Sequence, residues 1–302
     1  MAAQDRYRGA LIGLACGDAI GTSVEFMSRG TFPELVDMVG GGPFDLKPGQ
    51  WTDDTSMALC LAHSLLHCQG FDPVDQMHRY CNWYNYGYMS STGECFDIGN
   101  TTAMALRRYL ENKNPFAGST DAASAGNGGL MRLAPIPMYY AQDAKAVFHY
   151  AGESTRTTHG AQEAIECSRL FGLQLRAALC GGSKQDILSV AYPEPLSPGV
   201  APIAGAAFAA KSADRIKGSG YCVQSLEAAL WCFRQSGSFK EAVLKAANLG
   251  DDADTTAAIC GQLAGAYYGF SAIPDTWVMK LEMHEDIIGL ADRLYAKRSA
   301  HV

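Results

Sequence analysis

Two acidic clusters near opposite ends of the chain constrain its fold more than any other sequence feature. The first cluster is Thr52-Asp53-Asp54-Thr55, and the second is Asp251-Asp252-Ala253-Asp254-Thr255-Thr256. Packed carboxylates repel one another unless a cation lies between them, and two such clusters together offer an oxygen cage for hard divalent ions. We therefore expect a fold that joins the two clusters at a dinuclear Mg²⁺ or Mn²⁺ site.

Helix capping is the alternative explanation of each cluster. Apolar residues at helical spacing follow both, from Met57 to Leu65 after the first and from Ala257 to Ala266 after the second. Short acidic and hydroxyl side chains at such a boundary also cap helix N-termini, which explains either cluster alone equally well. The repetition of the same chemistry in one chain favours the metal site.

Helical periodicity continues along the whole chain, and no run of alternating β-branched residues competes with it. We expect an all-α fold in one domain over residues 1–302, with long irregular loops that cover or form a site at 28–51, 87–98, 113–127 and 192–220. The expected helices are 5–20, 54–68, 73–86, 99–112, 128–140, 143–157, 160–180, 184–191, 221–236, 239–248, 255–269 and 284–297.

The composition narrows the class of protein. Hydrophobic residues make up 48% of the chain and charged residues only 18%, and Ala and Gly are frequent, which predicts helices packed closely through small side chains. The net charge of −7 argues against non-specific binding of nucleic acid. The ten cysteines show no CxxC pair, and we interpret them as reduced thiols. The chain lacks a signal-peptide core or a run of about 18 apolar residues, so we expect a cytoplasmic protein without a membrane partner.

Three glycine-containing segments are candidates for a ligand site. Asp18 lies within Gly17–Gly21 and Glu25 follows it, where a helical pattern ends with a carboxylate free to face a pocket. The segments 97–101 and 126–132 place small residues and backbone amides at the start of a helix, an arrangement that suits a phosphate. A helix C-terminus with solvated acidic residues is the alternative explanation of the first segment, and flexible turns explain the glycines of the other two equally well.

Histidines and aromatic residues carry weaker signals. His159 stands alone at a helix boundary, where capping or packing is the more common role. His63 and His67 lie four residues apart near Cys60, but the run around them resembles an ordinary core helix more than a zinc site. The aromatic stretch 83–88 is better explained by packing than by stacking on a base.

Taken in order, these motifs resemble those of the ADP-ribosylglycohydrolase family, and most of all its bacterial ADP-ribosyl-dinitrogen reductase hydrolase type. The resemblance spans about residues 5 to 295. One departure is Asp251, where relatives usually carry a second glycine, and it leaves the metal preference open. The motifs that carry the resemblance are Gly17–Gly21 with Glu25, Thr52–Thr55, Asp97–Asn100, Gly126–Arg132, Thr158-His159 and Asp252–Thr255.

The resemblance implies a compact orthogonal helical bundle with two Mg²⁺ or Mn²⁺ ions at the base of a cleft. It implies that Asp97 lines the ribose and diphosphate region, that His159 lies beside the nucleotide, and that Glu25 approaches the metals and yields when substrate enters. The implied metal ligands are Thr52, Asp53, Asp54, Asp252, Asp254 and Thr255. The implied substrate-binding residues are Gly99, Asn100, Gly126, Asn127, Gly128, Gly129, Met131 and His159.

The implied activity is hydrolysis of the glycosidic bond between ADP-ribose and an acceptor, with Asp97 or Glu25 as the acid/base. The partners are then ADP-ribose and an ADP-ribosylated protein, with arginine as the leading acceptor. Other acceptors are serine, the acetyl group of O-acetyl-ADP-ribose and nucleic acid. A metal-dependent phosphoesterase or nucleotide hydrolase is an alternative enzyme. A non-catalytic ADP-ribose-binding protein is the alternative of another class, and the two intact clusters speak against it.

Overall fold

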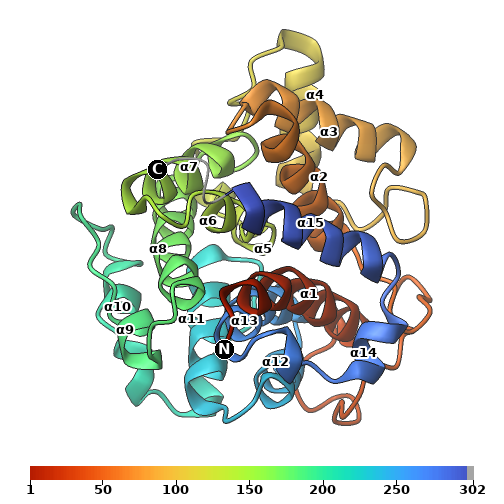
Figure 1. The fold of residues 1–302 in the computed structure, drawn as a ribbon, viewed down its shortest axis with the longest axis vertical. Helices are drawn as coiled ribbons and strands as arrows, with labels where there is room; N and C mark the ends of the chain where they lie inside the picture. Colours follow the sequence, from red (N-terminus) through yellow and green to blue (C-terminus); the bar gives the residue numbers. More distant parts are fainter. Residues whose placement is uncertain (298–302) are drawn as a thin grey trace.

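The computed structural model describes residues 1–297, and it confirms the all-α prediction (Figure 1). Within these residues β pairing is limited to isolated bridges such as Ser28–Gly250, and no helix is both long and apolar enough to cross a membrane. The helices are α1 (Ala3–Gly21), α2 (Asp53–Cys68), α3 (Pro73–Tyr86), α4 (Asn100–Asn112), α5 (Gly128–Met131), α6 (Pro135–Tyr139), α7 (Ala144–Arg156), α8 (Gln162–Leu179), α9 (Lys184–Leu188), α10 (Ala201–Ala204), α11 (Cys222–Gln235), α12 (Phe239–Ala247), α13 (Ala253–Tyr268), α14 (Asp275–Lys280) and α15 (His284–Lys297).

The expected helix 128–140 is the main error in these predictions. It is divided into α5 and α6, because Pro135 has no amide hydrogen to donate to the Met131 carbonyl four residues earlier, which interrupts the helical hydrogen bonds there. The buried amide of Gln262 in α13 compensates for the break: its oxygen accepts from the Ala134 amide at 2.8 Å, and its nitrogen donates to the Met131 carbonyl at 2.7 Å. Helices α10 and α14 were not expected, since four and six residues are too few to show a periodicity.

An antiparallel pair of helices from opposite ends of the chain, α1 and α13, lies in the main hydrophobic core. Glycines let the two backbones touch: a Cβ atom on Gly13 would lie 2.3 Å from the Gly261 carbonyl oxygen, and one on Gly17 would lie 2.1 Å from that of Ala257. This contact confirms the expected packing through small side chains. It also brings the end of α1, with Asp18, against the start of α13, with Asp254.

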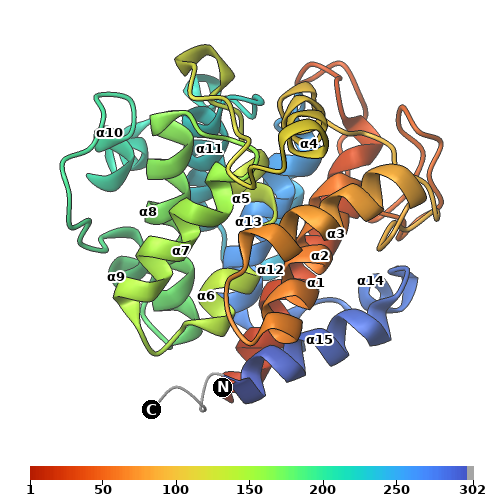
Figure 2. The same cartoon turned by 90° about the horizontal axis from the view of Figure 1, so that it is seen from above.

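Other helices extend the core on both sides of this pair. Helices α2, α3 and α4 lie on one side of the molecule and α7 to α11 on the other, with the short α5 between them (Figure 2). Buried side chains of α2, α3 and α4, among them Trp83 and Tyr80, form a second, smaller core together with Met131 of α5. Helix α15 packs on α1, where Arg8 donates two hydrogen bonds of 2.7 Å to Asp292.

Candidate functional site

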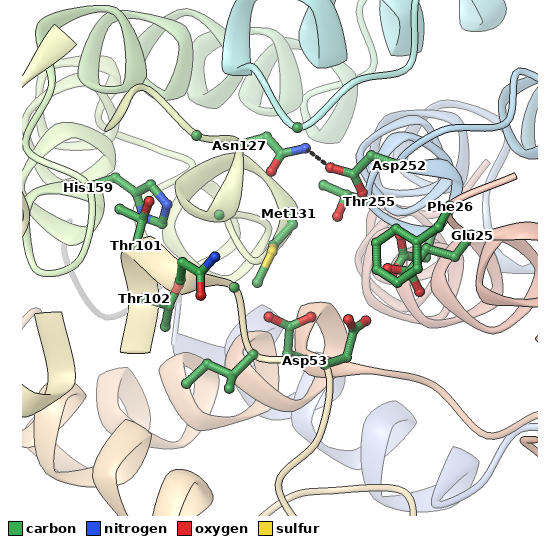
Figure 3. Close-up of a pocket in the computed structure, with 18 residues that line it drawn as sticks. Glu25, Phe26, Asp53, Thr101, Thr102, Asn127, Met131, His159, Asp252 and Thr255 are labelled. Carbon is green, nitrogen blue, oxygen red and sulfur yellow. Dashed lines mark hydrogen bonds between the residues drawn. The ribbon is translucent and has the colours of Figure 1, made fainter. Parts of the chain in front are cut away.

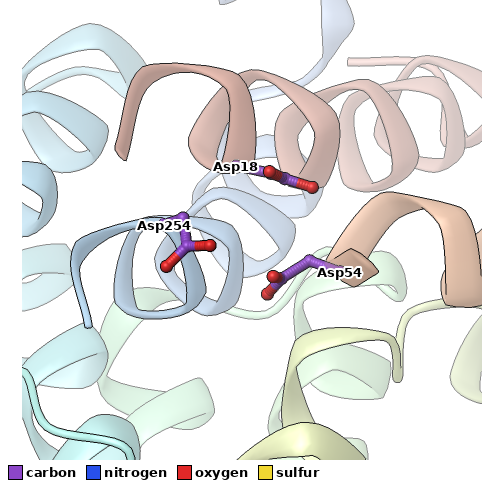
Figure 4. A group of neighbouring side chains, drawn as sticks. All are labelled: Asp18, Asp54 and Asp254. Carbon is purple, nitrogen blue, oxygen red and sulfur yellow. The ribbon is translucent and has the colours of Figure 1, made fainter. Parts of the chain in front are cut away.

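Carboxylates from three helices converge where α1, α2 and α13 meet. Asp18, Asp54 and Asp254 each present one oxygen atom within 4.8 Å of the other two (Figure 4). Glu25 and Asp97 form a second such group, and Asp254 belongs to both groups. The fold therefore joins the two acidic clusters, as the sequence predicted.

Asp18 holds the start of α2 in place. One of its oxygens accepts hydrogen bonds from the amide and hydroxyl of Thr52, at 2.8 and 2.9 Å. The other accepts from the amide and hydroxyl of Thr55, at 2.9 and 2.6 Å. Neither Thr52 nor Asp252, the residues before α2 and α13, caps its own helix with its side chain. The capping explanation therefore does not account for either cluster.

Several oxygens of these two carboxylate groups have no hydrogen-bond partner within residues 1–297. These are Oδ1 of Asp54, Oδ1 of Asp254 and Oε2 of Glu25, all buried. Burial, followed by the negative charge of Asp18 on Asp54 and of Glu25 on Asp254, raises the pKa of both aspartates well above their usual range. Buried and unpartnered carboxylates are costly, and a hard divalent cation removes that cost because it prefers oxygen ligands. The donor set thus fits Mg²⁺ or Mn²⁺.

The other expected ligands lie within this group or beside it. Thr52 lies within it, with Oγ1 at 3.3 Å from oxygens of both Asp54 and Asp254. Asp53, Asp252 and Thr255 line the adjoining cavity. Burial and the charge of Asp97 raise the pKa of Asp53 well above its usual range.

The cavity above the carboxylates has a volume of about 410 Å³. Glu25, Asp252 and Thr255 lie on one side of it, and His159 and Thr101 lie on the other (Figure 3). Its lining residues are Glu25, Phe26, Asp53, Asp97–Thr102, Gly126–Gly128, Met131, His159, Gly220, Asp252, Asp254 and Thr255. All expected site residues line this cavity except Thr52 and Asp54, which lie in the carboxylate group beneath it, and Gly129.

Glu25 and Asp97 occupy the acidic side of the cavity. Burial, followed by the charges of Asp97 and Asp252, raises the pKa of Glu25 to about 9. Burial, followed by the charge of Asp18, raises the pKa of Asp97 to about 7. Asp97 also has a φ of +58°, a backbone conformation that aspartate tolerates better than most side chains.

Two groups of backbone amides were expected to face a phosphate, and only one group is free throughout. At the start of α4 the amides of Asn100, Thr101 and Thr102 have no acceptor within the described chain, and Gly99 offers no side-chain cap. The second group is the glycine loop, residues 126–129. There the Gly126 amide donates to the Ser124 carbonyl and the Asn127 amide donates to the Gly220 carbonyl. Two of the four loop amides that we expected to face a ligand are therefore occupied, Gly126 by a local turn and Asn127 by a tertiary contact.

The glycines of this loop make room for protein side chains. A Cβ atom on Gly128 would lie 2.5 Å from Cε1 of His159, and one on Gly129 would lie 2.5 Å from Cγ2 of Thr155. The side-chain nitrogen of Asn127 donates to Asp252 at 2.8 Å and to Ser225 at 3.1 Å (Figure 3). Asn127 thus ties the loop to the second acidic cluster.

Sequence reasoning missed two features of the site. It noticed Asp18 but did not place it among the metal-site residues, and its partners Thr52 and Thr55 become visible only in the fold. It did not consider Phe26, which lines the cavity, is 70% exposed and has a φ of +62°. Phe26 and Met27 exchange backbone hydrogen bonds of 2.8 Å with Asp251, whose φ is +58°. Asp251 is exposed, in a conformation that glycine adopts without strain.

The weaker sequence hypotheses are resolved as follows. In the described chain the groups of three or more candidate metal ligands consist of carboxylates, and His63 instead lies beside the Tyr88 ring. Trp83 is buried in the smaller core and does not line the cavity, so packing explains it. All ten cysteines are free thiols.

Comparison with known proteins agrees with this architecture. A family model described as ADP-ribosylglycohydrolase matches residues 1–301. The "ADP-ribosylarginine hydrolase Tri1" of Pseudomonas putida (strain GB-1) is 44% identical over 293 residues, which cover 97% of this chain and 78% of that protein. The "ADP-ribosyl-[dinitrogen reductase] glycohydrolase" of Rhodospirillum rubrum is 31% identical over 297 residues, which cover 92% of this chain and 91% of that protein.

A solved structure described as "ADP-ribosylglycohydrolase-related protein complex" superposes with a TM-score of 0.88 at 45% identity, covering 98% of this chain and 99% of that one. The helical bundle, with its carboxylate-lined cavity where the end of α1 meets the start of α13, is thus that of a glycoside hydrolase, and its carboxylate groups could hold metal ions. The chain belongs to the ADP-ribosylglycohydrolase family.

Proposed function

We propose that this protein removes ADP-ribose from modified arginine side chains of proteins, with two divalent cations, Mg²⁺ or Mn²⁺, bound between α2 and α13. The observation that carries the proposal is the convergence of Asp54 and Asp254, each with a buried oxygen that has no hydrogen-bond partner in the part of the chain that the structure describes. Asp254 belongs to both carboxylate groups, so it would be a ligand of a cation held by either group. When bound, such cations supply a Lewis acid and lower the pKa of a water molecule near the anomeric carbon.

The residues of the chain position the substrate around that point. The free amides of Asn100 to Thr102 at the start of α4 are donors for the diphosphate, and His159 lies on the same side of the cavity. The distal ribose then reaches the carboxylates. Asp97 is our preferred acid/base: it donates a proton to the leaving acceptor nitrogen as water adds to the anomeric carbon and the glycosidic bond breaks.

Arginine is the acceptor that the site favours. Glu25, Asp97 and Asp252 make its side of the cavity acidic, and no Lys or Arg among the described residues lines that cavity. The exposed ring of Phe26 at the same side offers a face on which a planar guanidinium can stack. The Pseudomonas putida relative is named for this linkage. Ten free thiols support a reducing compartment, and we place the protein in the cytoplasm.

The test is product identification with the purified protein and Mg²⁺ or Mn²⁺. Peptides ADP-ribosylated on Arg, on Ser or on Asp/Glu are incubated separately, together with O-acetyl-ADP-ribose and a nucleic-acid adduct, and the products are identified by mass. We expect intact ADP-ribose and unmodified arginine peptide. Release of AMP or phosphate would identify a phosphoesterase, and tight ADP-ribose binding without product would identify a binding protein.

A further inference from the structure

Arg132 is a fully buried cation at the end of the glycine loop, and it does not line the cavity. Its guanidinium lies over the ring of Tyr80 at 4.8 Å, and its Nη2 donates to the hydroxyl oxygen of Thr158 at 2.6 Å. That hydroxyl lies 2.9 Å from Nδ1 of His159. The three side chains form a chain of hydrogen bonds that starts in the core and ends at the cavity wall.

The direction of these hydrogen bonds follows from their donors. An arginine can only donate, so the Thr158 oxygen accepts from Arg132. The single hydrogen of the Thr158 hydroxyl then has one acceptor within reach in the described structure, which is Nδ1 of His159. The opposite assignment, with a hydrogen on Nδ1, would leave a buried hydroxyl hydrogen without an acceptor, at a cost of about 1–3 kcal/mol.

The other ring nitrogen faces the ligand space. Nε2 of His159 has no hydrogen-bond partner within residues 1–297, and the ring lies against Gly126 and Gly128, where a Cβ atom would come within 3.1 and 3.0 Å of Nε2. Burial, together with the charge of Arg132, lowers the pKa of His159 to about 3, so the ring is neutral near pH 7. A neutral imidazole carries one hydrogen on its two nitrogens, and since Nδ1 accepts a hydrogen bond, that hydrogen is on Nε2.

We infer that Arg132 and Thr158 are positioning residues that fix His159 as the Nε2–H tautomer, so that its ring donates a hydrogen bond to a phosphate oxygen of the bound nucleotide. Figure 3 shows His159 beside Thr101, whose helix offers the free amides, and across the cavity from Glu25 and Asp252. The hydrogen bond to a phosphate oxygen rests on the proposed function, whereas the assignment of the tautomer does not.

The tautomer is measured directly by ¹⁵N NMR of histidine-labelled protein with Mg²⁺ at pH 7. We expect an unprotonated Nδ1 and a protonated Nε2 for His159 in the wild-type protein. A hydrogen on Nδ1 would overturn the inference, and this measurement needs no variant to fold.

Paired variants test the positioning role. Thr158→Val removes the hydroxyl at nearly constant size, and Thr158→Ser keeps it. Calorimetry should show ADP and ADP-ribose binding about tenfold more weakly to Thr158→Val, the loss expected of one hydrogen bond to a charged acceptor, and near wild-type binding to Thr158→Ser. The Thr158→Val protein should also lose the fixed tautomer in its NMR spectrum.

Three results would contradict this assignment. Equal losses in both variants would show that the Thr158 methyl group matters through packing, and unchanged affinity in Thr158→Val would remove the positioning role. Weaker binding of ADP-ribose with unchanged binding of ADP would place the contact at the distal ribose instead of the diphosphate. If the wild-type protein bound neither ligand, the proposed function and the ligand part would fail together, and the tautomer result would stand by itself.

Discussion

Asp18 binds Thr55 twice, accepting from its hydroxyl at 2.6 Å and from its amide at 2.9 Å, and so attaches the first turn of α2 to α1. Because the same carboxylate also accepts two bonds from Thr52, it fixes the orientation of Asp53 and Asp54 between them. Asp18 thus contributes to the proposed metal site by positioning α2, in addition to its own charge.

Replacing Asp18 by Ala is expected to destabilise the metal-free protein by about 2–4 kcal/mol. The substitution leaves four donors of Thr52 and Thr55 without their acceptor in a buried place, and relief of carboxylate repulsion offsets only part of that loss. Urea unfolding measures the change, and exposed Glu111→Ala in α4 serves as the control. An Asp18→Ala protein as stable as wild type would show that these hydrogen bonds do not hold α2.

Removing a central ligand should separate stability from metal binding. In Asp54→Ala or Asp254→Ala, a carboxylate with an unpartnered oxygen is lost, so turnover should be abolished. The metal-free variants should melt at or above the wild-type temperature because repulsion is relieved. Excess Mn²⁺ should stabilise the wild-type protein, by about 2.7 kcal/mol at one hundred times Kd, but not the variants. Exposed His67→Ala should respond like wild type. Mn²⁺-dependent activity in either aspartate variant would refute the ligand assignment.

Gly128→Ala tests whether the close contact between the His159 ring and the glycine loop matters for ligand binding. A methyl group there meets Cε1 of His159 at 2.5 Å and must displace the ring, so ADP-ribose affinity should fall about tenfold or more. Gly289→Ala, where a Cβ atom meets nothing within 4 Å, is the matched control and should bind normally. Calorimetry and a melting curve on the same samples decide. Unchanged ADP-ribose affinity with a lower melting temperature would mean that Gly128 is needed only for the conformation of the loop.

The pKa of His159 gives stability a defined pH dependence. Burial and Arg132 lower it from 6.5 to about 3, so between these values the unfolded chain binds a proton that the folded protein does not. The contribution of the neutral ring is complete above pH 6.5 and is lost as pH falls, at up to about 1.4 kcal/mol per pH unit. The unfolding free energy of wild-type protein should therefore fall more steeply between pH 6.5 and 4.5 than that of His159→Gln. Parallel curves for the two proteins would show that His159 titrates normally.

Local patterns predicted the helices well and the tertiary contacts only in part. The expected bounds 73–86 and 284–297 agree with α3 and α15, because caps and apolar spacing are local signals. The role of Asp18 depends on partners 34 and 37 positions away, and the Asn127 amide is used by Gly220 from another loop. No local pattern encodes such contacts. That residues 1–302 form one domain stays a prediction, which the packing of α15 on α1 supports.

The last prediction separates Asp97 from Glu25. Asp97 lines the cavity beside Glu25 and Asp254, where its carboxyl group is in a position to donate a proton, and asparagine also tolerates its φ of +58°. Asp97→Asn should therefore keep the backbone and the ADP-ribose affinity while single-turnover cleavage falls about 10²–10⁴-fold.

The Glu25 side chain is more buried and has an unpartnered oxygen among the described residues. Glu25→Gln should therefore change ligand affinity and metal occupancy with a smaller loss of rate. Single-turnover kinetics and calorimetry on both variants make the comparison. Wild-type cleavage by Asp97→Asn together with an inactive Glu25→Gln would reverse the assignment and make Glu25 the acid/base.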